Sequence, residues 1–333
     1  MTNIPISLVE DECNLYFSEN THVLDITSYD SKRWESDIQK YCLSSENGII
    51  SIGWECLYED KMNHILDCIG KYNSKFKLHS SNISEHPNVL SPYTSIALLH
   101  STAFFHDFII DTNADYNILD NVNLCDDIIK HGINKHIFLH KPNSIKTNKY
   151  IISARRFNNS RRLIFENINI ESPTGIIRPP NTDYNNLNDG NYVNTDELMN
   201  EYSKSFISLI LETAVDTNRN LGYYIPMTEK TIIGFHTNTL PIVLGNRGLN
   251  KRLTELGFWT GNELYNIFDE FNDTEESFSN IVNEFDTQDT RFIQNIYNDN
   301  LDKILNNNKI IKTLFNIGRK YNTDYDEFKY LYE

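Results

Sequence analysis

The sequence predicts an α/β protein built on open parallel sheets. Short runs of β-branched residues alternate along the chain with segments in which apolar residues recur at a helical period. Strands and helices that alternate in this way are typical of parallel sheets covered by helices. The chain has 333 residues, of which 39% are hydrophobic and 23% charged, so it is long enough for two domains with a core each.

The first half of the chain contains four predicted strands and two predicted helices. Residues 60–72 have apolar side chains at Met62, Ile65 and Ile69, a helical period that Asp60 is suited to cap. A second helix is predicted for residues 92–105, where Pro92 would stand in the first turn. The predicted strands are residues 21–27, 48–54, 75–79 and 137–140.

The polar stretch from Lys141 to Asn148 is the best candidate for a linker. It has no apolar periodicity, and strand–helix patterns lie on both sides of it. We therefore expect an amino-terminal domain of residues 1–145 and a carboxyl-terminal domain of residues 146–333.

The second half of the chain repeats the alternation. Strands are predicted for residues 149–154, 175–178, 206–211 and 241–245. Helices are predicted from Asn159 or Ser160 to about Ile168, for residues 195–202, from Thr228 onward and for residues 248–256. The acidic remainder from Asn262 is expected to be helical, and residues 181–194, rich in Asn and Asp, to form a surface loop.

Positive charge is concentrated in one part of an acidic chain. The net charge is −16, yet residues 130–178 hold ten Lys and Arg against only Glu166 and Glu171. Such a basic segment indicates a binding site for an anion. It is too small for a surface that binds a nucleic-acid duplex, and about right for a pyrophosphate.

Cysteine content and hydropathy favour a cytoplasmic protein. The cysteines are odd in number and include no Cys-x-x-Cys pair, so we expect neither a disulfide framework nor a structural zinc site. No run approaches the roughly 18 apolar residues of a membrane span, and the amino terminus lacks a signal-peptide pattern. The five cysteines are Cys13, Cys42, Cys56, Cys68 and Cys125.

The Thr-Glu-Lys-Thr sequence of residues 228–231 opens a predicted helix. Thr228 is suited to cap it, and the free amides of the first turn favour a phosphate. Lys230 places a positive charge where the helix dipole opposes it, so a bound anion would relieve that conflict. Glu229 would accept hydrogen bonds from the hydroxyls of a ribose or hexose. The alternative interpretation is an ordinary capped surface helix.

Four arginines surround a predicted strand-to-helix turn, at Arg155, Arg156, Arg161 and Arg162. Such a turn lies at the carboxyl edge of a sheet, where α/β proteins bind ligands. Guanidinium groups bind phosphate oxygens in pairs. Because adjacent residues cannot all face one ligand, we expect Arg155 and Arg161 to point inward and their neighbours into solvent. A solvated basic helix start is the alternative.

The order of these segments resembles the donor-binding half of fucosyltransferase-like glycosyltransferases. It looks closest to a microbial and viral branch that carries the Thr-Glu-Lys-Thr motif, and the similarity covers about residues 149–290. The resemblance implies a GT-B fold, in which two Rossmann-like domains face each other across a cleft. The first domain would hold the acceptor and the second the sugar nucleotide. The segments are residues 150–155 with Arg161, then 209–213, 228–231, 240–245 and 256–258.

The resemblance also implies a set of donor-binding residues. Arg155 and Arg161 would face the donor phosphates, and Lys230 would bind the diphosphate. Tyr223 or Tyr224 would supply an aromatic ring that the family places where this chain has Pro226, so the base of the nucleotide stays open. The full set is Arg155, Arg161, Glu212, Tyr224, Thr228, Glu229 and Lys230.

The implied reaction is transfer of a sugar from a nucleoside diphosphate to a hydroxyl of a glycan or small acceptor, with inversion. We expect no metal and no cofactor besides the sugar nucleotide, because we find no histidine cluster at clear ligand spacing and because positive side chains would stabilise the leaving group. A base must deprotonate the acceptor hydroxyl. Glu55, after the predicted strand of residues 48–54, is the first candidate, and the pair His106-Asp107 is the second.

Two other functions stay open. A glycosyltransferase that modifies DNA bases would fit a viral, AT-rich genome, which the Asn/Ile/Lys/Tyr-rich composition suggests. Residues 1–129, however, hold seven basic residues against twenty acidic ones, which disfavours a nucleic-acid acceptor. The third is a non-catalytic module that binds a nucleotide sugar; the presence of Arg155, Glu229 and Lys230 counts against it.

Overall fold

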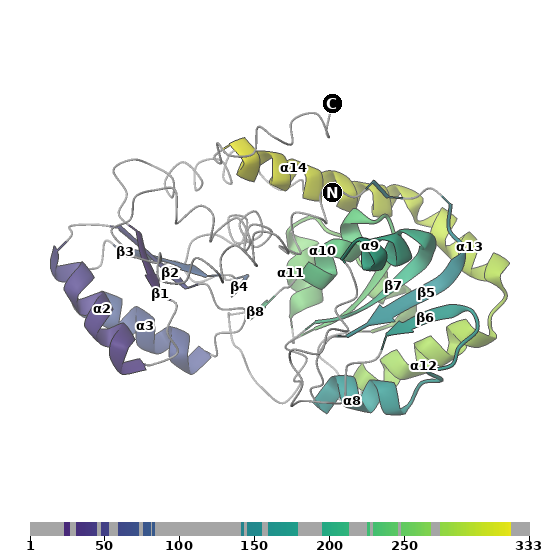
Figure 1. The fold of residues 1–333 in the computed structure, drawn as a ribbon, viewed down its shortest axis with the longest axis horizontal. Coiled ribbons are helices and arrows are strands. Elements are labelled where there is room, and N and C mark those ends of the chain that lie inside the picture. The colour runs from purple at the N-terminus through teal and green to yellow at the C-terminus, as the bar shows by residue number, and fades with distance from the viewer. Residues whose placement is uncertain are drawn as a thin grey trace. The chain divides into compact units, whose positions relative to one another are not determined.

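Each of two units of the chain is built around a parallel sheet (Figure 1). The first unit comprises Met1–Asn3, Lys135–Asn220 and Met227–Thr313, and the second Ile4–Asn134, Leu221–Pro226 and Leu314–Glu333. The predicted domain boundary between residues 145 and 146 stays a prediction. The computed structural model describes residues 23–26, 31–44, 48–52, 59–72, 76–80, 82–83, 141–142, 145–154, 159–178, 195–212, 225–226, 229–245, 248–267 and 274–320.

The first unit contains a four-stranded, fully parallel sheet in the order β6-β5-β7-β9. Its strands are β5 (Asn148–Ser153), β6 (Gly175–Arg178), β7 (Ser205–Leu211) and β9 (Leu240–Leu244), and each lies on a predicted strand. The chain runs from β5 outward to β6 and then returns past β5 to β7. The direction of strand order therefore changes between β5 and β7, the place where open α/β sheets bind ligands.

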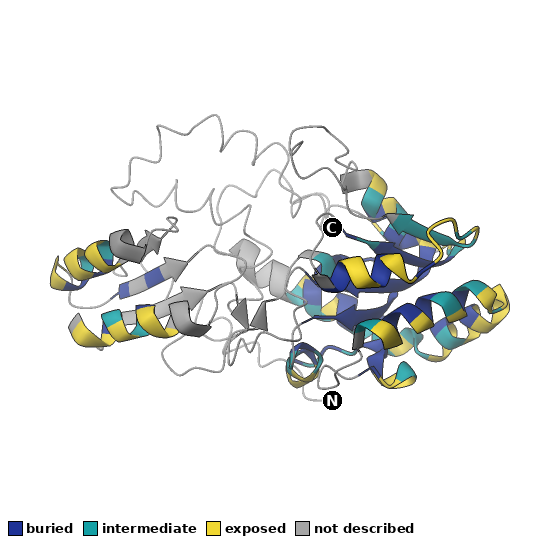
Figure 2. Cartoon of the chain, turned by 90° about the horizontal axis from the view of Figure 1, so that it is seen from below, coloured by how far each residue is buried: buried dark blue, intermediate teal, exposed yellow. Residues whose placement is uncertain are grey.

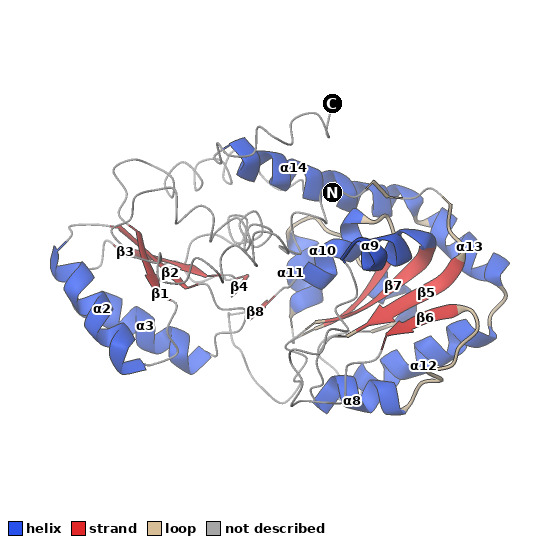
Figure 3. Ribbon diagram, viewed as in Figure 1, coloured by secondary structure: helices blue, strands red, loops and turns tan. Residues whose placement is uncertain are grey.

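Helices cover both faces of this sheet (Figure 3). On one face lie α8 (Asn159–Glu166), α12 (Thr274–Thr287) and α13 (Thr290–Asp299), and on the other α9 (Thr195–Lys204) and α10 (Glu229–His236). Every residue of β7 and β9 is buried, as expected for strands covered on both sides. Figure 2 shows the same separation, with buried strands and helices that expose only their outer sides.

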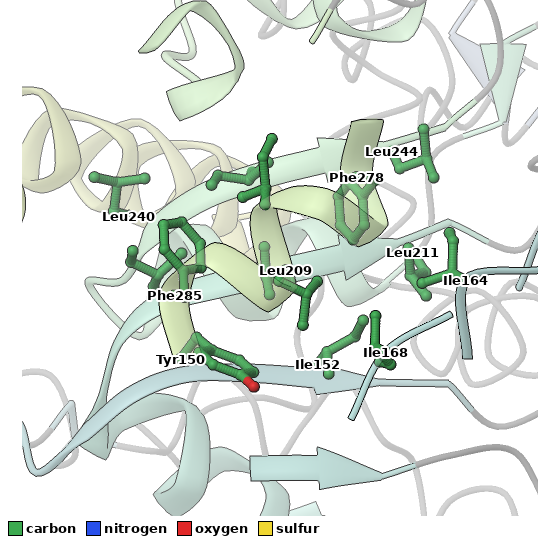
Figure 4. Packing of buried hydrophobic residues seen from close by; sticks show 14 of the residues in the cluster. Tyr150, Ile152, Ile164, Ile168, Leu209, Leu211, Leu240, Leu244, Phe278 and Phe285 are labelled. Carbon is green, nitrogen blue, oxygen red and sulfur yellow. The ribbon is translucent and has the colours of Figure 1, made fainter. Parts of the chain in front are cut away.

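The main core lies between the sheet and the face covered by α8, α12 and α13 (Figure 4). Alternate residues of β7 point to this face, while Ser208 and Ile210 point to α10. Tyr150 packs on Phe285 with ring centroids 6.1 Å apart, and its hydroxyl donates to Asp286 Oδ1 at 2.6 Å. The polar end of this buried tyrosine is thus satisfied within the core.

A glycine sets how closely α10 approaches the sheet. A Cβ atom at Gly234 would lie 2.6 Å from Ile210 Cδ1 and 2.9 Å from Ser208 Oγ, both on β7. A larger residue would push the helix away from the strand. Gly234 therefore sets the distance between α10 and β7.

The carboxyl-terminal part of the described chain is helical, as predicted from Asn262 onward. After β9 come α11 (Leu249–Glu255) and a 3-10 helix, η2 (Gly261–Tyr265), followed by α12, α13 and α14 (Leu301–Lys320). Asn262 ties η2 to β9, since its side chain accepts from the Val243 amide and donates to the Val243 carbonyl.

The second unit contains a three-stranded parallel sheet in the order β1-β2-β3. Its elements are β1 (Val23–Ile26), α2 (Ser31–Ser44), β2 (Gly48–Ile52), α3 (Glu59–Tyr72) and β3 (Phe76–Ser80). A short antiparallel pair joins β4 (Asn82–Ile83) to β8 (Ile225–Pro226). The three long strands and α3 agree with the prediction, whereas α2 was not predicted. The predicted helix 92–105 and strand 137–140 lie outside the described residues.

The α/β class is therefore confirmed, with nine α-helices and a four-stranded parallel sheet in the described part of the chain. The facing arrangement of a GT-B fold stays a prediction. None of the helices within the described ranges is both long and apolar enough to cross a membrane.

Candidate functional site

A buried arginine joins the first turn of α8 to the carboxyl end of β7. Arg161 lies in the first turn of α8, the helix that follows β5, and its side chain is only 1% exposed. Its Nη2 atom donates to the carbonyl oxygen of Leu211, the last residue of β7, at 2.6 Å. A positive charge is thus fixed at the point where the strand order changes direction.

The residue directly after β7 is a buried glutamate. Glu212 is fully buried, and its amide donates to Leu244 on β9 at 2.9 Å, which extends the sheet by one residue. Because side chains alternate along a strand, Glu212 points to the opposite face from Leu211, toward α10. There its Oε1 atom accepts from the Thr231 hydroxyl at 2.5 Å.

These contacts connect α8, the end of β7 and the first turn of α10. Thr231 is fully buried in that first turn, and Lys230, immediately before it, is half-buried. A positive guanidinium, a lysine and the amide groups of a helix start all lie near one sheet edge. Donors and positive charges in this arrangement suit an anionic ligand such as a phosphate.

The structure separates the two arginines of the pair at residues 161 and 162 as predicted. Arg161 is buried, while Arg162 is exposed and its Nε donates to Glu166 Oε1 at 2.8 Å, one helical turn away. Whether a ligand phosphate contacts Arg161 stays a prediction. The predicted alternative, a wholly solvated basic helix start, does not describe Arg161.

Several predicted site residues fall outside the description. Glu229 is the first residue of α10, in agreement with a helix predicted to open at Thr228. The roles assigned to Lys230, Glu229 and Glu212 stay predictions. Arg155, Tyr224, Thr228, Glu55 and the pair His106-Asp107 lie outside the described residues.

Sequence reasoning missed two features of this edge. Thr231 was quoted as part of the motif but given no role, whereas it is the partner of Glu212. Ser160, a predicted helix cap, instead donates from its hydroxyl to Glu275 Oε1 at 2.6 Å, which links the first turns of α8 and α12. A polar residue directly after a buried apolar strand was the available signal for Glu212 and its partner.

His236, the last residue of α10, is a packed side chain with only 1% of its surface exposed. The expectation of a metal-free reaction must allow for an Asp-x-Asp triplet, Asp324-Tyr325-Asp326, which lies outside the described residues.

Comparisons with known proteins add little. No protein-family model matches the chain, and no curated protein is significantly similar to it. Among solved structures, a crystal structure of an α1,3-fucosyltransferase matches 93% of this chain and 98% of its own, with 13% sequence identity and a TM-score of 0.32. A structural similarity this low carries no argument about the site.

Proposed function

We propose that this protein is a glycosyltransferase that binds a nucleoside-diphosphate sugar at the carboxyl edge of its four-stranded sheet. One observation carries the proposal. Arg161 donates to Leu211, 50 residues away in sequence, and Thr231 donates to Glu212, 19 residues away. Leu211 and Glu212 stand at the carboxyl end of β7, beside the change in strand order, the position at which α/β sheets bind nucleotides. The resemblance of residues 149–290 to the donor-binding half of fucosyltransferase-like enzymes supports the same site from sequence.

Each residue of this edge would make a different contribution to binding the diphosphate. Lys230, being only half-buried, would contact the phosphate oxygens directly, and the first-turn amides of α10 would donate to them. The hydrogen bond from Thr231 to Glu212 would hold those amides in place against β7. The buried charge of Arg161 would stabilise the diphosphate through the low-dielectric interior. Glu229 would bind the ribose or the sugar.

The proposed reaction is a single displacement. The acceptor hydroxyl oxygen forms a bond to the anomeric carbon, the bond from that carbon to the diphosphate oxygen breaks, and the nucleoside diphosphate leaves with the electron pair. A base takes the hydroxyl proton, for which we propose Glu55. Lys230, Arg161 and the helix amides would offset the negative charge that grows on the leaving group, without a metal ion.

The donor site is tested by thermal unfolding of the full chain with UDP, GDP, CDP, dTDP and their common sugar conjugates. A ligand at 100 times its Kd adds roughly 2.7 kcal/mol to the native state, equivalent to about 5–10 °C in Tm for a unit of this size. We expect such a shift with one nucleotide, unchanged by magnesium. No shift with any of these nucleotides would refute the proposal.

Two lysine substitutions test whether the nucleotide binds at the proposed site. Lys230→Ala removes a charged contact to the diphosphate and is expected to weaken binding about 10- to 100-fold. Lys251→Ala removes an exposed lysine of α11 in the same unit, and nucleotide binding should not change. Turnover is then followed as release of the nucleoside diphosphate. Binding without release or transfer, over a panel of hydroxyl acceptors, would favour a non-catalytic module.

A further inference from the structure

Three side chains of different chemistry meet on the helices of the second unit. Glu35 on α2 and His64 and Cys68 on α3 each bring one potential metal ligand, and these atoms all lie within 4.8 Å of one another. His64 Nε2 and Glu35 Oε1 are already 2.7 Å apart. Glu35 and His64 are exposed, and Cys68 is half-buried, so an ion would reach the group from solvent.

The fold brings these residues together from two helices. Each helix connects neighbouring parallel strands, α2 from β1 to β2 and α3 from β2 to β3. Crossovers of the usual right hand place both helices on the same face of the sheet, side by side, and α2 packs against α3. His64 and Cys68 are four residues apart and so lie one turn apart on one side of α3.

The buried residues of the helix pair fix this packing. Ile65 and Ile69 directly follow the two α3 ligands in sequence, and both are buried. On α2, Ile38 and Cys42 are buried, and Glu35 lies three residues before Ile38. The three ligands therefore stand at the border of a packed helix–helix contact, which limits how far they can separate.

We propose that Glu35, His64 and Cys68 bind a zinc ion that ties α2 to α3 and leaves a fourth position for water. The mixed nitrogen, sulfur and oxygen donors suit zinc, whereas magnesium and calcium prefer oxygen alone. In a tetrahedral site the ligand atoms stand about 3.3–3.7 Å apart, as follows from zinc bond lengths. The present separations reach that range with small side-chain rotations, which two exposed residues can make.

The charges of the three donors suit a divalent cation. One carboxylate and one thiolate, which loses its proton when zinc binds, would neutralise the two positive charges of the ion. This inference does not rest on the proposed glycosyltransferase activity.

Zinc binding is measured on the full chain after removal of metals by chelation. Titration against a chromogenic zinc chelator should give one zinc per chain, and cobalt substitution should give a thiolate-to-cobalt charge-transfer band. Each of Cys68→Ser, His64→Gln and Glu35→Gln should weaken zinc binding by more than about 10-fold, at least the effect of losing a residue that merely orients a ligand. Cys68→Ser should also abolish the charge-transfer band.

Lys40→Gln is the matched control, because it changes an exposed residue of α2 that is not one of the three ligands. It should leave zinc affinity and the cobalt band unchanged. Circular dichroism tests whether each variant is folded. Because Glu35 and His64 are exposed, we expect His64→Gln and Glu35→Gln to leave the packed contact between the helices unchanged. Absence of stoichiometric zinc, or zinc binding that survives all three substitutions, would overturn the proposal. Nucleotide-dependent thermal shifts should be the same in these variants, so this proposal and the donor site fail separately.

Discussion

Charged side chains at the amino and carboxyl edges of the four-stranded sheet have different hydrogen-bond partners. At the amino edge, Lys149 is 6% exposed and donates to the carbonyls of Phe285, Asp286 and Gln288 at the end of α12. Lys146 donates to the carbonyls of Ser203 and Thr237 at 2.8 and 3.1 Å. At the carboxyl edge, Arg161 and Glu212 are joined to the backbone of β7 and to α10.

The direction of the helices explains this difference. Helices that connect parallel strands run against them, so they end at the amino edge, where their last carbonyls need donors. Lys149, which is buried, and Lys146, which is half-buried, donate to those carbonyls and complement the negative ends of the helices. At the carboxyl edge the helices begin, and the N–H groups of their first turns need hydrogen-bond acceptors. The amino edge is therefore a structural brace, and the carboxyl edge is the place suited to an anionic ligand.

The largest effect is expected from Arg161→Ala. This change leaves a cavity where the largest fully buried side chain among the described residues stood. It also removes the donor to the Leu211 carbonyl, so it should cost about 3–5 kcal/mol of unfolding free energy. Denaturant unfolding measures it. Arg162→Ala, one residue on and exposed, should produce no measurable change. A loss below about 1 kcal/mol for Arg161→Ala would mean that this buried charge contributes no net stability.

Lys146 at the amino edge predicts a pH dependence. Burial lowers the pKa of Lys146 from 10.5 to about 7, so between these values the unfolded chain holds a proton that the folded chain lacks. Stability should therefore rise with pH from 7 to 10, by no more than about 4 kcal/mol, and the cost of burying the charge should be fully present below pH 7.

The matched variant Lys146→Met should flatten that rise. Unfolding is followed at a series of pH values up to 10 only, because burial raises the pKa of Tyr150 and Tyr265, and their ionisation in the unfolded chain would reverse the trend at higher pH. An identical slope in the native protein and the variant would show that Lys146 does not titrate in this interval.

Lys149→Met should cost less than the arginine change, about 2–3 kcal/mol, because the methionine fills most of the space while three carbonyls lose a charged donor. Lys204→Met, at an exposed position near the same edge, is the control and should change little. If the amino edge is only a brace, nucleotide binding should be unaffected in Lys149→Met once the protein is folded. A specific loss of binding would break the distinction between the two edges.

The smallest effect is expected from Glu212→Gln. The glutamine still accepts from Thr231 but without a charge, so the loss should be about 1 kcal/mol. A double-mutant cycle with Thr231→Val isolates the pair, and its coupling should be favourable. If this contact positions the first turn of α10 for a diphosphate, both single variants should also weaken nucleotide binding. Coupling near zero would show that the contact does not hold α10.

Sequence patterns located most of the described elements of the first unit because those patterns are local. The apolar run Phe206–Leu211 and the proline-containing strand at Leu240–Leu244 needed only their own residues to be recognised. The helix α2 was missed because few apolar residues mark its buried side, chiefly Ile38 and Cys42. Its burial depends on α3, a partner that no local pattern contains.

Some features of the candidate sites could likewise be predicted from sequence, and others could not. From sequence alone came the basic segment, the helix opening at residues 228–231 and the inward direction of Arg161, because charge count and helical spacing are properties of neighbouring residues. Only the tertiary structure decided that Arg161 reaches Leu211, that Glu212 meets Thr231, and that Glu35 lies beside His64 and Cys68. Those pairs come from different strands and helices, and their meeting depends on strand order and on which face each helix covers, which long-range packing alone determines.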